Sequence, residues 1–301
     1  MNDVNIYLGS LPKIKNHNIK LDVMRAFAEG AKQCGASVRI VEERQLSPAK
    51  LAIMIGWYSQ AGGGPHIMFR QSIIDYQAQN NHRVMPIDGS CFKFVNDSTL
   101  WLRYSIDSIF YNEGNYANTN SDGSKWRAIS SDLGITLEPW QQQGNHVLIC
   151  LQRDGGWSSK GFDQDEWLKI TIKLIRQKTN RPILIRPHPS NKKNYDYWLG
   201  KDNIFVSNSL KSALHSDLKN AHAAVFWNSS SAVAAILAGV PVFVGDVSSV
   251  AWDVANHDIG MIENPSLPDR QQWLWNLSAA HWSIDQSRRG DIYQKFLPYL
   301  A

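Results

Sequence analysis

The apolar run His146-Val-Leu-Ile-Cys-Leu151 ends in a glycine-rich segment, Gln152-Arg-Asp-Gly-Gly-Trp-Ser158. A helical pattern at 163–177 follows, and then a second apolar run that stops at two prolines, Pro182-Ile-Leu-Ile-Arg-Pro-His-Pro189. Short apolar runs that alternate with helical patterns predict βαβ units and a parallel sheet. Residues 144–246 therefore decide the fold.

Two more apolar runs continue this pattern, at 223–227 and 240–246, with an Ala-rich helical stretch at 232–238 between them. Ligands of parallel α/β sheets bind beyond the carboxyl ends of the strands. We therefore predict a ligand site that is rich in partners for phosphate and hydroxyl groups. Its residues are Arg153, Gly155, Gly156, Trp157, Ser158, Arg186, His188, Asn228, Ser229, Ser230, Ser231 and Asp246.

The amino-terminal part repeats the α/β pattern. Its expected strands and helices lie at 4–9, 21–34, 37–41, 51–56, 67–79 and 83–88. The stretch 92–140 is irregular, and a hinge is expected at 134–144. We predict one Rossmann-like domain at 1–143, a second at 144–285, and a last segment at 286–301 that could return to the first domain.

Length and composition fit a protein of two ordinary α/β domains. The chain has 301 residues, of which 43% are hydrophobic and 19% charged, as in soluble globular proteins. No membrane-spanning run and no signal peptide are recognisable, so a cytoplasmic location is expected. The three cysteines are widely spaced, which argues against a disulfide framework. The net charge of +4 fits an anionic partner.

Two combinations of these motifs resemble known families. The segment 186–189, followed by 228–231, the Ala-rich helix and Gly239-Val-Pro-Val242, resembles the carboxyl half of capsule-type Kdo transferases. The segments 152–158 and 186–189 together are also similar to phage-encoded DNA glycosyltransferases of the hydroxymethylcytosine glucosyl- or arabinosyltransferase type. The first resemblance covers roughly the last half of the chain. It implies an α/β fold of two Rossmann-like domains facing a cleft, the GT-B glycosyltransferase architecture.

The resemblance implies a nucleotide-sugar donor, and the residues at the strand ends suit its leaving phosphate. An enzyme of this type must stabilise negative charge that grows on phosphate oxygens. Arg153 offers a planar fork for phosphate, Gly155 and Gly156 let the backbone approach closely, and the serine run can bind an anion at a helix start. The alternatives are an ordinary glycine turn, a plain serine N-cap, and a His188 that only holds a turn.

The Asp163-Gln-Asp165 segment has the Asp-x-Asp form with which metal-dependent glycosyltransferases hold manganese. It lies where a helix is expected to begin, and acidic residues are favoured there by capping and by the helix dipole. We therefore expect a metal-independent GT-B enzyme. No cofactor is expected beyond the nucleotide-sugar co-substrate, a UDP-sugar such as UDP-arabinose or UDP-glucose.

An inverting transfer needs a base that takes the proton from the acceptor hydroxyl. Asp88, at the end of an expected strand, is the first candidate, with Glu113 and His66 behind it. The alternative for Asp88 is an Asp-Gly turn, and a retaining enzyme needs no such base.

The acceptor is expected on the amino-terminal domain. Its candidate residues are Trp57, Tyr58, Gly63, Gly64 and Arg103. We predict 5-hydroxymethylcytosine in double-stranded phage DNA as the acceptor, which would place the protein in the host cytoplasm. Two alternatives stay open: transfer to a capsule or surface glycan or glycolipid, and a non-catalytic nucleotide- or nucleic-acid-binding protein.

Overall fold

The computed structural model describes residues 2–11, 17–59, 62–92, 101–141, 143–156 and 161–300. It divides into two compact units. Unit 1 comprises Met1–Ile129 and Leu274–Ala301, and unit 2 comprises Ser130–Trp273. The chain passes between the units inside α3 (Ser124–Leu133) and inside α7 (Gln271–Ala279). Both passages lie before the boundaries expected from the sequence, at 143/144 and 285/286.

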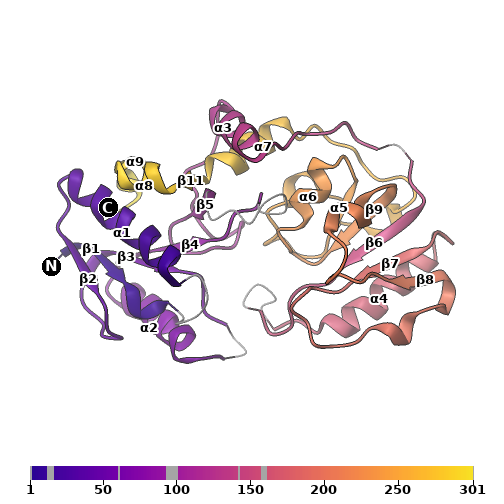
Figure 1. The fold of residues 1–301 in the computed structure, drawn as a ribbon, viewed down its shortest axis with the longest axis horizontal. Helices are drawn as coiled ribbons and strands as arrows, with labels where there is room; N and C mark the ends of the chain where they lie inside the picture. Colours follow the sequence, from indigo (N-terminus) through magenta and orange to yellow (C-terminus); the bar gives the residue numbers. More distant parts are fainter. Residues whose placement is uncertain are drawn as a thin grey trace. The chain divides into compact units, whose positions relative to one another are not determined.

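Unit 1 is built on a six-stranded sheet of order β11-β5-β4-β3-β1-β2 (Figure 1). Its strands are β1 (Asn2–Tyr7), β2 (Val38–Val41), β3 (Ala49–Ile55), β4 (Arg83–Asp88), β5 (Trp101–Tyr104) and β11 (His281–Ser283). The first four are parallel to one another, whereas β5 runs antiparallel to both β4 and β11. The stretch that looked irregular in sequence therefore contains β5.

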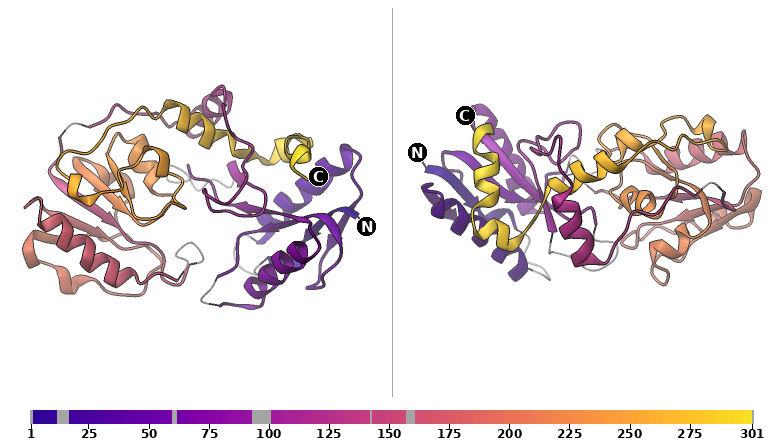
Figure 2. Two further views of the ribbon diagram at one scale, coloured as in Figure 1. Left: turned by 180° about the vertical axis from the view of Figure 1, so that it is seen from behind. Right: turned by 90° about the horizontal axis from the view of Figure 1, so that it is seen from above.

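Helices cover both faces of this sheet. They are α1 (His17–Gln33), α2 (Pro65–Gln79), α8 (Ile284–Arg288) and α9 (Asp291–Phe296), with the short turns η1 (Leu8–Ser10) and η7 (Leu297–Tyr299). Helices α1 and α2 lie on opposite faces (Figure 1), as right-handed crossovers that lead away from a central strand require. Helices α8 and α9 lie beside α1 (Figure 2). Ile292 and Phe296 of α9 pack with Phe27 of α1 in the core.

Unit 2 contains a parallel five-stranded sheet of order β10-β9-β6-β7-β8. Its strands are β6 (His146–Cys150), β7 (Ile183–Arg186), β8 (Ile204–Val206), β9 (Ala221–Phe226) and β10 (Val242–Val244). Its helices are α4 (Gln164–Arg176), α5 (Leu214–Leu218) and α6 (Ala232–Leu237), and its short turns are η3 (Asp196–Trp198), η4 (Lys201–Asn203), η5 (Trp252–Val254) and η6 (Ile259–Met261).

The core of unit 2 explains why its strands read as continuous apolar runs. Val147, Ile149, Ile183 and Ile185 are all fully buried, because helices cover both faces of a parallel sheet. Helices α4 and α6 lie on opposite faces (Figure 1). Both units are thus α/β folds with parallel-rich sheets, which confirms the predicted fold class. None of the helices in the described ranges has the length and apolar composition needed to cross a membrane.

Each sheet has one point at which the strand order reverses. In unit 1 it lies between β1 and β3, and in unit 2 between β6 and β9. The helices that follow the two central strands leave in opposite directions there, so a crevice opens at the carboxyl ends of those strands. These two switch points are where ligands of open α/β sheets bind.

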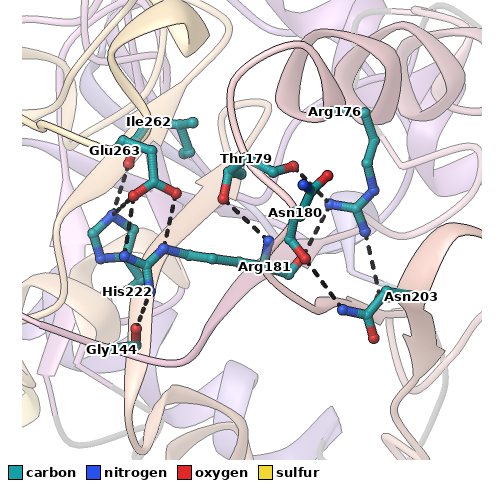
Figure 3. Close-up of polar contacts among 9 residues, drawn as sticks. All are labelled: Gly144, Arg176, Thr179, Asn180, Arg181, Asn203, His222, Ile262 and Glu263. Carbon is teal, nitrogen blue, oxygen red and sulfur yellow. Dashed lines mark hydrogen bonds and ion pairs between the residues drawn. The ribbon is translucent and has the colours of Figure 1, made fainter.

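The amino edge of the unit 2 sheet is instead closed by its own side chains (Figure 3). Arg181 donates from Nε and Nη2 to the two carboxylate oxygens of Glu263, at 2.9 and 3.0 Å, and from Nη1 to the Gly144 carbonyl at 2.5 Å. His222 Nε2 lies 2.9 Å from the Ile262 carbonyl oxygen. These contacts satisfy the charged groups of this edge internally and hold the strand starts together.

Candidate functional site

The carboxyl edge of the unit 2 sheet carries a hydrogen-bonded row of polar side chains. Gln152, just after β6, accepts a hydrogen bond at Oε1 from the Asn228 backbone N–H, just after β9, at 3.4 Å. Asn228 Nδ2 donates to Ser248 Oγ at 2.8 Å. Ser248 donates in turn to the Asp246 carboxylate, from its backbone N–H at 2.9 Å and from its hydroxyl. The row spans the switch point and joins the ends of β6, β9 and β10.

The loop after β6 is held in place by two amide side chains. Gln164, in the first turn of α4, accepts from the Gln152 N–H at 2.6 Å and donates to Asp154 Oδ1 at 3.0 Å. Asn191, after β7, donates to the Gln152 carbonyl at 2.9 Å and accepts from the Asp154 N–H at 2.9 Å. The glycine that follows, Gly155, has φ +64° and open space where a Cβ would lie. The base of this loop is therefore held by side-chain hydrogen bonds, and the backbone at Gly155 has open space beside it.

A pocket of about 290 Å³ lies beside this loop. It is lined by Arg153, Asp154, Gly155, Phe162, Asp163, Gln164, Asp165 and Lys193. Arg153 is exposed, and within the described ranges it forms no ion pair. Lys193 is paired with Asp165, and Asp163 caps α4 by accepting from the N–H groups of Asp165 and Glu166 at 3.0 and 3.1 Å. Arg153 is thus the cation that this pocket offers to a ligand.

Three half-buried aromatic rings lie together at the same strand ends. The ring of Phe162 stacks on that of Trp227, with centroids 4.6 Å apart and planes 7° apart. Trp167 meets Trp227 edge-on at 6.3 Å. A Cβ at Gly245 would lie 2.5 Å from the Trp227 ring, so only glycine fits beside it. The rings give the site an apolar wall of fixed orientation, which can stack on a flat ligand group.

Both terminal nitrogens of the Arg186 guanidinium have partners inside unit 2. The side chain is buried and pairs through Nη1 with the carboxylate of Asp217. It also donates to the Ser212 carbonyl at 2.9 Å and to the Ser207 hydroxyl at 3.4 Å. These partners suit a guanidinium that fixes the end of β7. The neighbouring His188 accepts at Nδ1 from the Ser190 N–H at 3.0 Å, which fits the alternative in which it holds a turn.

The remaining donor-site candidates cluster before α6 and after β6. The hydroxyls of Ser229 and Ser231 lie 2.7 Å apart, and Ser230 between them is half-buried. The Gly156 N–H donates to the Arg153 carbonyl at 3.2 Å. Two further candidates, Trp157 and Ser158, lie outside the described residues. The structure therefore brings most of the candidates from β6 and β9 to one edge.

In unit 1, Asp88 at the end of β4 pairs with Arg103 of β5. Asp88 Oδ2 accepts from Arg103 Nη2 at 2.5 Å, and the side chains are 18% and 6% exposed. Burial by itself would lower the pKa of Arg103, but the neighbouring Tyr116, Cys91 and Asp88 raise it above its ordinary value. Arg103 is therefore a permanent cation, and it fixes one oxygen of the Asp88 carboxylate.

The other two candidate bases lie in different surroundings. Glu113 is exposed and accepts from the Ser108 hydroxyl at 2.9 Å in the loop after β5. His66 lies in the first turn of α2, where burial and then the charges of Arg70, Arg44 and Lys20 lower its pKa. His66 is therefore biased toward its neutral form.

The acceptor-site candidates of the loop before α2 lie at the same edge as Asp88. Trp57 follows β3, and its ring packs on that of Tyr58 at a centroid distance of 5.6 Å. Gly64 is the N-cap of α2, without a side-chain cap, and Gly63 before it is exposed. Strands β3 and β4 are parallel neighbours, so their carboxyl ends bring this loop and Asp88 to one edge of the sheet.

Several residues that shape the unit 2 edge were not predicted from the sequence. They are Phe162, Gln164, Lys193, Asn191 and Ser248. Gln164 follows the capping residue Asp163, and residues of the first helical turn lie at the ligand-binding edge of a βαβ unit, so its position carried a usable signal. Across the described ranges, no group of three or more His, Cys, Asp or Glu residues could hold a metal ion.

Comparison with known proteins supports the architecture. No family model matches the chain, and no curated protein sequence matches it. Two solved structures of Thermosulfurimonas dismutans KpsC are similar. The β-Kdo 2,4-transferase has a TM-score of 0.54 and 13% identity over 92% of this chain and 89% of its own. The β-Kdo 2,7-transferase has a TM-score of 0.52 and 12% identity over 98% and 100%. The chain therefore has the GT-B glycosyltransferase fold of these capsule-type enzymes.

Proposed function

We propose that this protein is a glycosyltransferase that moves a sugar from a nucleotide-sugar donor to a hydroxyl group of an acceptor. The observation that carries the proposal is the carboxyl edge of unit 2. There an exposed arginine, Arg153, lies beside a pocket and an aromatic wall at the switch point of a GT-B fold. A nucleotide sugar needs a cation for its phosphate, a flat partner for its base and polar partners for its hydroxyls.

In this proposal each part of the edge has its own role. Arg153 binds a phosphate oxygen through its planar fork, and the backbone at Gly155 and Gly156 lets the phosphate approach closely. The ring of Trp227, held by Phe162, supports the base. The hydroxyl and amide partners of the sugar are Asn228, Ser229, Ser230, Ser231 and Asp246. Arg186 acts indirectly, because it holds the end of β7 through Asp217.

We propose that the transfer needs no metal. Both carboxylates of the Asp-x-Asp segment have partners within unit 2, since Asp163 caps α4 and Asp165 pairs with Lys193. A leaving phosphate could then be stabilised by Arg153 and by backbone N–H groups. Added EDTA should leave the turnover unchanged.

Asp88 is the proposed base. Its Oδ2 is fixed by Arg103, and its Oδ1 forms no hydrogen bond within the described residues. An anchored carboxylate with one accepting oxygen can take the proton of an acceptor hydroxyl.

The acceptor that we propose from the sequence is 5-hydroxymethylcytosine in double-stranded DNA, with a UDP-sugar as donor. The second candidate is a surface glycan or glycolipid, which the names of the two similar Kdo transferases favour. A non-catalytic nucleotide-binding protein would bind the donor without turnover.

The deciding experiment is nucleoside mass spectrometry. Hydroxymethylcytosine-containing and unmodified DNA are incubated with the protein and a panel of UDP- and CMP-sugars, and nucleotide release is followed in parallel. A sugar mass that appears only on hydroxymethylated DNA would establish donor and acceptor together. Nucleotide release without labelled DNA would exclude the DNA acceptor and keep the transferase. Donor binding without nucleotide release for any sugar of the panel, with DNA and with added surface glycans alike, would contradict the transferase.

A further inference from the structure

A buried arginine bridges the switch point of unit 1. Arg70, from α2, donates from Nε to the Ser10 carbonyl after β1 at 3.1 Å and from Nη1 to the Trp57 carbonyl after β3 at 3.0 Å. Its side chain is 7% exposed. A Cβ at Gly56, which has φ +79°, would lie 2.9 Å from Nη1. The glycine therefore leaves room for a cation at the point where ligands of such sheets bind.

No carboxylate lies within ion-pair distance of Arg70 among the residues that the structure describes, and its Nη2 has no hydrogen-bond partner there. Burial lowers the pKa of Arg70 to about 10, and the charge of Asp88 opposes this shift. Arg70 thus stays cationic at neutral pH. A buried cation without a paired acid is costly, and a bound anion would remove that cost.

A second buried arginine shares the same acid. Arg103 donates a hydrogen bond from Nη2 to Asp88 Oδ2, while its buried Nε and Nη1 have no hydrogen-bond partner in the described structure. Two guanidinium groups therefore share the field of one carboxylate. The half-buried Lys20 of α1 adds a further charge near Arg70, and burial, followed by the charge of Arg70, lowers the pKa of Lys20. This edge of unit 1 thus has more positive than negative charge, and several donor atoms on it are unused.

We propose that Arg70, Arg103 and Lys20 form a subsite for a compact oxyanion, the carboxylate or phosphate group of an acidic acceptor. The acceptor part of this proposal rests on the proposed transferase and favours its second acceptor candidate, a glycan, over DNA, whereas the binding of an oxyanion rests on neither. An anion held here would place its molecule next to the free oxygen of Asp88. The subsite would then position the acceptor hydroxyl for proton removal.

The burial of these cations favours one compact group over a nucleic-acid backbone. Duplex DNA is bound by exposed Lys and Arg side chains that follow successive phosphates. Arg70 and Arg103 are instead 7% and 6% exposed and lie at one edge of one sheet. Such enclosed guanidinium groups suit a single inserted group, such as the carboxylate of an acidic sugar or a phosphate ester, better than a row of phosphates.

Backbone amide NMR of the whole chain tests the binding with two probes, inorganic phosphate and acetate. We expect at least one of them to shift the amide signals of Gly56, Trp57 and Gly64 in unit 1. Arg70→Gln should weaken this binding at least about tenfold, as the loss of a charged hydrogen bond implies. The signals around Gly155 report the donor site separately and should respond to phosphate equally in both proteins.

Two further variants keep the test decisive. Lys20 is half-buried on α1. Lys20→Gln should also weaken anion binding, so this variant takes the place of Arg70→Gln if Arg70→Gln does not fold. Arg83→Gln removes the same charge from an exposed arginine that pairs with Asp107, and it should bind as the unaltered protein does. If neither anion shifts these unit 1 signals, or if Lys20→Gln and Arg70→Gln both bind normally, the subsite does not exist.

Kinetics then identify the acceptor class. With an acidic acceptor, Arg70→Gln should raise the acceptor KM about tenfold or more and leave the donor KM unchanged. Anion binding in unit 1 without any sugar transfer would retain the subsite and contradict the proposed function. Transfer to neutral acceptors alone, with equal KM in both proteins, would contradict the acceptor assignment. If duplex DNA binds in a salt-sensitive way and shifts the same unit 1 amide signals, the acceptor is DNA and the assignment of an acidic glycan is wrong.

Discussion

Arg186, at the end of β7, is paired through Nη1 with the carboxylate of Asp217 in α5, and both side chains are about nine-tenths buried. Removal of one partner leaves an uncompensated buried charge, which costs about 3–5 kcal/mol. We therefore expect Arg186→Ala to lower the free energy of unfolding by that amount, as measured by urea denaturation. The sequence instead placed Arg186 in the donor site, which predicts weaker donor binding in this variant.

A double variant separates the two interpretations of this pair. Replacing both charges by apolar residues, Arg186→Met with Asp217→Leu, removes the unpaired charge and should restore much of the lost stability. If Arg186→Ala instead unfolds at the urea concentration of the unaltered protein but no longer binds nucleotide sugar, the guanidinium contacts the ligand directly.

Arg153→Ala should behave in the opposite way. The side chain is exposed, and no ion pair holds it in the described ranges, so stability should change by less than about 0.5 kcal/mol. Loss of a charged hydrogen bond to phosphate should weaken nucleotide-sugar binding about tenfold or more, as measured by calorimetry. Lys178 is exposed in the turn after α4. Lys178→Ala is therefore the matched control and should bind the nucleotide sugar normally. Equal affinities in the two variants would remove Arg153 from the donor site.

Asp88→Asn should abolish transfer and preserve donor binding. The amide keeps the size of the side chain but cannot take a proton. The turnover number should therefore fall at least about a hundredfold, while the donor affinity stays the same. Asp75→Asn, an exposed acid on α2, serves as the control. A variant Asp88→Asn that transfers sugar at the normal rate would show that the base lies elsewhere or that none is needed.

His281 should make stability depend on pH below neutrality. Its Nε2 accepts from the Cys91 N–H at 3.0 Å and its Nδ1 lies 2.8 Å from the Leu277 carbonyl, so the ring is neutral. Burial, followed by the charge of Arg103, lowers its pKa to about 3 from 6.5. The unfolded chain therefore takes up this proton first as the pH falls. The stabilisation is complete above pH 6.5 and is lost toward pH 3.

Urea denaturation at several pH values between 7 and 4 measures this effect. One such group contributes a slope of up to about 1.4 kcal/mol per pH unit. Other acids also titrate in this range, so the comparison is with His281→Gln, which should show a shallower slope. Equal slopes in the two proteins would mean that His281 is protonated in the folded state.

The parallel strands could be predicted because burial on both faces leaves a strong signal. Val147, Ile149, Ile183 and Ile185 make short apolar runs. Strand β5 has no such signal, since Trp101–Tyr104 contains the charged Arg103 and its partner β11 comes much later in the chain. Strand β8 has only three residues. Both strands form because they pair with strands that are distant in sequence, and the local sequence pattern does not reveal such pairing.

From the sequence, site residues could be predicted only where they directly follow the carboxyl end of a strand. The rule that ligands bind beyond the carboxyl ends located Arg153 and Asn228. It could not show that Arg186 is occupied by Asp217, 31 residues later in the chain, because that contact depends on how α5 packs. For the same reason the sequence placed Arg70 only among the basic residues near the glycine-rich loop that could meet DNA. Its burial at the switch point follows from the packing of α2 against the sheet.

The two passages of the chain between the units also impose an order on synthesis. Unit 1 is completed by Leu274–Ala301, which supplies the edge strand β11 and core residues such as Ile292 and Phe296. All of unit 2 leaves the ribosome before these residues do. Unit 2 can therefore fold during translation, whereas the first 129 residues must wait with an open sheet edge and an uncovered face of α1. A chaperone that binds the growing chain would therefore find exposed apolar surface in these first 129 residues.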